Sequence, residues 1–84
     1  MERGTAVRAV VRVLAPYIGD TMARSATEAH CQRLGISGER VTPEQLDGLL
    51  AKLGSGLNVF IGREKSATVI DEARAALASL EAAS

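Results

Sequence analysis

The sequence has few of the residues on which enzymes and small stapled domains depend. Its 84 residues include one cysteine, one histidine, one tyrosine, one phenylalanine and no tryptophan. A single cysteine cannot form an internal disulfide, which excludes a disulfide-stapled scaffold and suits a reducing compartment, so we expect a cytoplasmic protein. One histidine and one cysteine are also too few for the common zinc sites. We therefore expect no metal and no other cofactor.

An excess of charge and a long apolar run are also missing. Lys plus Arg and Asp plus Glu each number 10, so the formal net charge is zero. Nucleic-acid-binding proteins usually carry a basic excess, because phosphate neutralisation dominates their affinity. No run approaches the roughly 18 apolar residues of a membrane span, and arginines interrupt the apolar stretch near the N-terminus. The sequence predicts neither a nucleic-acid partner nor a membrane partner.

Residues that could carry catalysis are not grouped. His30 and Cys31 are adjacent, and neighbours on a helix point about 100° apart, so they cannot form a nucleophile and base pair. The stretch from Gly62 to Ser66 lacks phosphate-loop spacing, because two residues separate Gly62 from Lys65. We interpret His30 as a surface or boundary residue and Cys31 as a small packed apolar group. The sequence therefore predicts no catalytic residue, and we do not expect an enzyme.

What the chain does contain is small apolar residues. The hydrophobic fraction of 46% comes mainly from Ala, Val and Leu. The length fits a single domain over residues 1–84. Alanine-rich faces bury little area, and small scaffolds often compensate by self-association. We therefore expect a homodimer.

The apolar spacing of the first half predicts two helices. In the first, apolar residues recur at intervals of three and four, and Pro16 is predicted to end it. In the second, Asp20 is predicted as the N-cap and Gly35 as the left-handed closing residue. The apolar residues are Ala6, Val7, Val10, Val11 and Leu14 in the first helix, and Met22, Ala26, Ala29 and Leu34 in the second.

The second half begins with the sharpest local signal of the chain. Thr42 and Gln45 flank Pro43 in the arrangement of a capping box, which predicts a helix start. Gly54-Ser55-Gly56 is predicted to end this helix, and 57–61 to form a short helix of its own. Gly62 then separates it from the longest helix, 63–80. The apolar faces are Leu46, Leu49, Leu50 and Leu53 in the third helix, and Ile70, Ala73, Leu77 and Leu80 in the last.

Together these patterns predict an all-α fold, an antiparallel bundle of four or five short helices. One alternative stays open. The segment 7–14 is rich in β-branched valine, and 57–61 is a short apolar run between glycines. If the two segments paired, they would form two antiparallel strands in an α+β fold.

The only two aromatic residues occupy similar positions in the sequence. Tyr17 precedes Ile18-Gly19, and Phe60 precedes Ile61-Gly62. Either both rings plug the ends of the core, or one of them anchors a partner, because tyrosine is enriched at binding hot spots. The valine stripe and the stripe from Ala73 to Leu80 are the two possible dimer contacts. The predicted partner-binding residues are Val7, Val11, Leu14, Tyr17 and Phe60.

The segment Leu14 to Ala26, with the sequence LAPYIGDTMARSA, resembles the start of a small helical domain of uncharacterised function. That domain is found behind kinase, receiver and other regulatory modules of bacterial signalling proteins. The family typically has a Y-I-G-P corner and an A-x-x-L-V stretch. Here Asp20 replaces the proline, and 23–26 replaces the apolar part. The resemblance implies an accessory role in signalling and carries over no catalytic residue.

These observations predict a non-catalytic module that binds another protein chain, or its own copy, in a bacterial regulatory system. A small ligand-binding sensory domain is the alternative. In that case the loop 35–41 and the segment 54–62 would form the rim of a pocket. A third possibility is an enzyme fragment whose catalytic partners lie on another chain.

Overall fold

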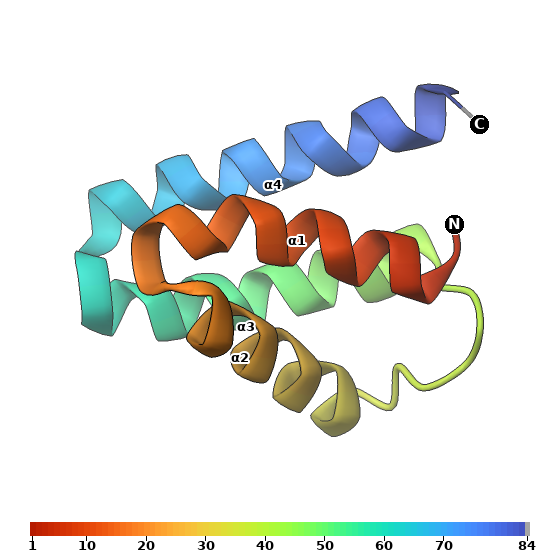
Figure 1. Cartoon of the computed structure of the whole chain (residues 1–84), viewed down its shortest axis with the longest axis horizontal. Coiled ribbons are helices and arrows are strands. Elements are labelled where there is room, and N and C mark those ends of the chain that lie inside the picture. The colour runs from red at the N-terminus through yellow and green to blue at the C-terminus, as the bar shows by residue number, and fades with distance from the viewer. Residues whose placement is uncertain (84) are drawn as a thin grey trace.

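The structure, a computed structural model, describes residues 1–83 and consists of four helices. These are α1 (Arg3–Ile18), α2 (Asp20–Arg33), α3 (Pro43–Ile61) and α4 (Arg63–Ala83). They pack as an antiparallel bundle around one core (Figure 1). The described residues contain no strand and only an isolated bridge between Glu2 and Arg40. The all-α prediction is therefore confirmed, and the two-stranded alternative is wrong.

The four helices are not equally close to one another. Helix α1 packs against both α2 and α4, and α3 packs along α4, whereas the packing between α2 and α3 is sparser. The corners at Gly19 and Gly62 lie at one end of the bundle (Figure 1). The N-terminus and the loop between α2 and α3 lie at the other end. The sparsely packed side between α2 and α3, the α2–α3 face, therefore has both glycine corners at one end.

Helix α1 buries the face that its spacing predicts. Its buried residues are Ala6, Val7, Val10, Val11 and Leu14, as expected. The prediction that Pro16 ends the helix is wrong, because α1 continues to Ile18. Pro16 lies in the last turn with its side chain exposed, so its missing N–H removes one backbone hydrogen bond at most. The backbone N–H of Gly19 then donates to the carbonyl of Ala15 at 2.8 Å and closes the turn.

Helix α2 buries a different face from the predicted one. The buried residues are Ala23, Thr27 and Cys31, whereas Met22 and Leu34 are exposed. Thr27 can be buried because its Oγ1 donates to the carbonyl of Ala23 at 2.8 Å, which satisfies the hydroxyl within the helix. The predicted N-cap is also wrong. Asp20 is the first helical residue, and Gly19 occupies the N-cap position with no side-chain hydrogen bond.

Helix α3 starts at the predicted capping box. The backbone N–H of Gln45 donates to Thr42 Oγ1 at 3.1 Å, and the backbone N–H of Thr42 donates to Gln45 Oε1 at 2.9 Å. The predicted leucine face is buried as well. It consists of Leu46, Leu49, Leu50 and Leu53, and Leu57 extends it.

The predicted break at Gly54-Ser55-Gly56 is wrong, because α3 is one continuous helix to Ile61. Gly54 marks the place where α4 comes close. A Cβ at this position would lie 3.3 Å from Ile70 Cγ1, and Ser66 Oγ donates to the Gly54 carbonyl at 2.9 Å. Packing against α4 thus stabilises helical backbone that glycine alone would disfavour. The bundle consequently has four helices.

Removing the capping box should weaken the start of α3. Thr42→Ala and Gln45→Ala are each expected to lower the free energy of unfolding by about 0.5 to 2 kcal/mol. Amide hydrogen exchange in the first turns of α3 checks the cause, since those amides should exchange faster in both variants. Unchanged exchange in both variants would show that the capping bonds contribute nothing.

Candidate interaction surfaces

Three of the five predicted partner-binding residues lie inside the bundle. Leu14 has no exposed surface, and Val7 and Val11 retain 8% each. Leu14 therefore cannot contact a partner unless the bundle opens. Val7 and Val11 keep a narrow exposed edge along the groove between α1 and α2, described below. The stripe that was expected to form a dimer interface mainly holds α1 against the rest of the core.

The two aromatic residues are exposed, so neither plugs the core. Tyr17 lies on the side of α1 that faces α4, where its hydroxyl donates to Glu72 Oε1 at 2.9 Å. That hydrogen bond is the main reason why the pKa of Tyr17 is raised above its ordinary value. Phe60 lies in the last turn of α3, and 63% of its surface is exposed.

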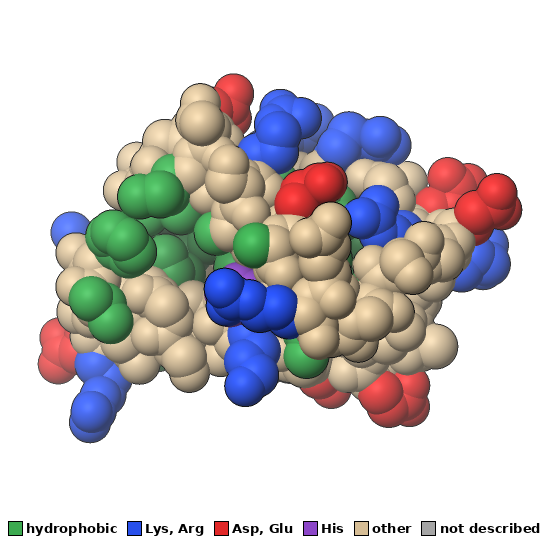
Figure 2. Space-filling model, turned by 90° about the horizontal axis from the view of Figure 1, so that it is seen from below, with side chains coloured by type: hydrophobic (Ala, Val, Ile, Leu, Met, Phe, Trp, Pro, Cys, Tyr) green, Lys and Arg blue, Asp and Glu red, His purple; other side chains and the backbone are tan. Residues whose placement is uncertain are grey.

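An exposed apolar surface lies at the corner end of the sparse α2–α3 face. Large apolar side chains gather at one end of the face that Figure 2 shows, and this is the end of the two glycine corners in Figure 1. Val59 is 85% exposed and Met22 is 44% exposed, alongside Phe60. We call Met22, Val59 and Phe60 the corner patch.

The two glycine corners next to these residues share one geometry. Gly19 has φ 87° and ψ 156°, and Gly62 has φ 87° and ψ 163°, a region of backbone space that is essentially restricted to glycine. Each glycine joins two helices without an intervening loop. The isoleucine before each glycine, Ile18 or Ile61, is half-buried against the core. In α3 the register that turns Ile61 inward leaves Val59 and Phe60 facing solvent.

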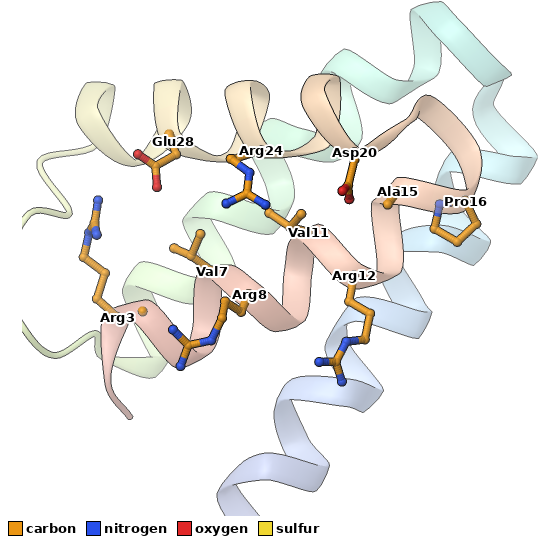
Figure 3. A pocket seen from close by; sticks show the side chains of 11 residues that line it. Arg3, Val7, Arg8, Val11, Arg12, Ala15, Pro16, Asp20, Arg24 and Glu28 are labelled. Carbon is orange, nitrogen blue, oxygen red and sulfur yellow. The ribbon is translucent and has the colours of Figure 1, made fainter.

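A second surface feature is a groove of about 760 Å³ between α1 and α2. In Figure 3, Val7 and Val11 point from α1 toward α2, and the side chain of Arg24 reaches from α2 toward α1. Arg8 and Arg12 project from α1 on the side turned away from α2, at the outer edge of the groove. The remaining lining residues are Arg3, Gly4, Ala15, Pro16, Asp20 and Glu28.

His30 and Cys31 have the environments that the sequence predicts. Cys31 is fully buried, and burial raises the pKa of its thiol, which disfavours the reactive thiolate. His30 is half-buried. Its pKa is lowered chiefly by desolvation, and the cations of Arg33 and Lys52 lower it further. Within residues 1–83, no group of three His, Cys, Asp or Glu side chains lies close enough to hold a metal ion.

The pocket rim expected for a sensory domain is not formed. The loop 35–41 lies at the N-terminal end of the bundle, whereas Gly62 lies at the opposite end (Figure 1). The loop instead pairs with the N-terminal residues. The Arg3 N–H donates to the Glu39 carbonyl at 2.8 Å, and the Val41 N–H donates to the Met1 carbonyl at 2.9 Å.

Reasoning from the sequence did not find Met22 and Val59 as surface residues, or the arginines of α1 and α2 as one group. The four-residue spacing of Leu53, Leu57 and Ile61 could have placed Val59 outside the core. The approach of Arg24 to α1 has no signal in the sequence, because it depends on how the two helices cross.

The chain matches no protein-family model, no curated protein and no solved structure. Among the described residues, no helix has the length and apolar character that crossing a bilayer requires.

Proposed function

We propose that this chain is a non-catalytic protein-interaction module, and that it self-associates as a homodimer through the corner patch. The observation that carries the proposal is the exposure of Phe60 and Val59 in a protein whose core consists almost entirely of Leu, Val, Ile and Ala. Exposed apolar clusters of this kind are typical of interaction sites, and aromatic residues dominate binding energies there.

A second copy of the chain is the partner that fits this patch best. Twofold interfaces are the commonest in homo-oligomers, and they bring the same patch of each copy together. Phe60 would then pack against the patch of its partner and leave water. Burial of one such side chain contributes roughly 1.5 to 3 kcal/mol, and twofold symmetry counts each contribution twice. A domain this small gains most from such added burial.

The biological setting that we propose is a bacterial regulatory or signalling protein. Its support is the resemblance of Leu14 to Ala26 to the accessory helical domain of such proteins. The exposed surfaces agree with an accessory role, since they offer apolar and cationic contacts.

Sedimentation equilibrium tests the proposed dimer. At micromolar concentration the wild-type chain is expected to sediment with about twice its 8.8 kDa mass. Phe60→Lys is expected to shift the equilibrium to monomer, because the interface would have to bury an unpaired ammonium group.

Leu34→Lys is the matched control. Leu34 is also an exposed apolar residue, at the C-terminal end of α2, so the substitution makes the same change near a helix end. This variant should dimerise like wild type. A wild-type chain that stays monomeric at every concentration would contradict the proposal, as would a Phe60→Lys variant that dimerises normally.

A further inference from the structure

The α1–α2 groove concentrates positive charge in a chain that is neutral overall. Four arginines line it, Arg3, Arg8, Arg12 and Arg24, against the two carboxylates of Asp20 and Glu28. The whole chain, by contrast, has 10 cationic and 10 anionic side chains. The groove is thus a local cationic surface that the net charge conceals.

Three of these guanidinium groups have no partner in the part of the chain that the structure describes. An ion pair joins Arg74 of α4 and Asp47 of α3 at 2.7 Å and includes no arginine of the groove. Arg3 is partly engaged, since its Nε donates to the Ile36 carbonyl at 3.1 Å. Among the arginines of the groove, the side chains of Arg8, Arg12 and Arg24 form neither an ion pair nor a hydrogen bond with a described residue. Their forked donors are therefore free to bind carboxylates.

The floor of the groove is apolar and elongated. Val7, Val11 and Ala15 follow one another at intervals of four residues along α1. From Gly4 to Pro16 the lining spans 12 helical steps, roughly 18 Å at about 1.5 Å per residue. That length equals about three turns of a helix. A groove of this length, with cations along it and an apolar strip of eight helical steps from Val7 to Ala15, roughly 12 Å, matches one face of an amphipathic helix better than it matches a compact small molecule.

We propose that the α1–α2 groove binds an acidic amphipathic helix of a partner protein. Apolar side chains of the partner would cover Val7, Val11 and Ala15, and its carboxylates would pair with Arg8, Arg12 and Arg24. No residue of the corner patch lines the groove, so this is a second surface with a different partner. A module with both surfaces could dimerise through one and recruit an acidic segment through the other.

The apolar floor of the groove argues against a nucleic acid, whose affinity comes mainly from its phosphates. The apolar floor has no counterpart in a chain of phosphates. A partner helix with both acidic and apolar residues can pair with the arginines and cover the apolar floor at the same time.

A displayed library of random peptides about four helical turns long is the first probe. Peptides enriched on the wild-type chain are expected to combine Asp or Glu with apolar residues at intervals of three and four. A synthetic copy of the most enriched peptide is then titrated by fluorescence anisotropy. Arg8→Glu with Arg12→Glu is expected to weaken its binding by about tenfold or more, and added salt should weaken it further.

Lys52→Glu with Lys65→Glu is the matched control, because it makes the same two charge reversals at exposed positions outside the groove. Its affinity should stay within about twofold of wild type, and Phe60→Lys should also retain binding. Circular dichroism checks that each variant is folded. If the charge reversal unfolds the chain, Arg8→Gln with Arg12→Gln takes its place, with the same loss of binding expected.

Three results would overturn this proposal. The first is an absence of enriched peptides, or the enrichment of neutral or basic ones. The second is an equal loss of affinity in the control variant. The third is tighter binding of a fluorescent oligothymidylate, used as a further probe, than of the acidic peptide. That result would identify phosphate as the preferred partner. None of these results depends on the corner patch, so a failure of this proposal can be distinguished from a failure of the proposed dimer.

Discussion

Replacing Leu14 with alanine is expected to lower the free energy of unfolding by about 2 to 5 kcal/mol. Leu14 is fully buried between the helices, so the shorter side chain leaves a cavity that the neighbouring residues fill only in part. In a domain of 84 residues this loss is a large share of the total stability. Urea denaturation followed by circular dichroism measures it.

Leu34→Ala provides the comparison for Leu14→Ala. Leu34 is 38% exposed, and its truncation is expected to change the free energy of unfolding by only about 0.5 kcal/mol.

The concentration dependence of the loss in Leu14→Ala also separates the two roles that the sequence allows for Leu14, a core residue or a partner contact. A loss that appears only at concentrations where the chain dimerises would restore Leu14 as a partner contact. A loss that is the same in dilute protein establishes it as a core residue.

Replacing Gly62 with alanine is expected to cost about 1 to 3 kcal/mol, because its backbone lies in a region that L-residues strongly disfavour. Space is not the cause, since an added Cβ at Gly62 meets no atom within 4 Å. The cost should therefore be the same for serine or alanine at this position. Thermal and urea denaturation of the variant give the change directly.

Gly56→Ala is the control for the corner glycine. Gly56 lies inside α3 with no positive φ and no atom near its added Cβ. Alanine there is expected to stabilise the protein by about 0.5 to 1 kcal/mol, because glycine has the lower helix propensity. Equal effects of the two substitutions would contradict the assignment of Gly62 as a conformationally required glycine.

The sequence was most informative where large apolar residues alternate with charged ones. In α1 and in the first half of α3, the spacing of Val and Leu predicted the buried faces, since those side chains have no comparable alternative to the core. The capping box of Thr42 and Gln45 was also predictable, because its hydrogen bonds join residues only three positions apart.

Helix α2 shows why the spacing of apolar residues does not predict the buried face of an alanine-rich segment. Its apolar residues are small and occur on several faces, so hydrophobic spacing hardly distinguishes one face from another. The buried face includes Thr27, whose hydroxyl is satisfied by Ala23 within the helix itself. Met22 and Leu34, the largest apolar residues of the segment, are left exposed. Tertiary packing selects the buried face here, and one-dimensional periodicity does not contain that information.

The end of α3 was misassigned for a related reason. Two glycines within three residues are a strong local signal for a break. In the folded protein, Gly54 allows the close approach of Ile70 and Ser66, and the helix continues. Because a break was assumed, Val59 and Phe60 were not placed on the outer face of one long helix. The exposure of Val59 and Phe60 in the corner patch thus depends on packing between α3 and α4 that the sequence does not reveal.

Intermolecular NOE measurements on a dimer test the central proposal most directly. One chain would carry ¹³C and its partner would be unlabelled, so that only contacts between copies are detected. We expect contacts from the ring of Phe60 in one copy to the methyl groups of Val59 and Met22 in the other. Intermolecular contacts confined to another face, or none at millimolar concentration, would contradict self-association through the corner patch.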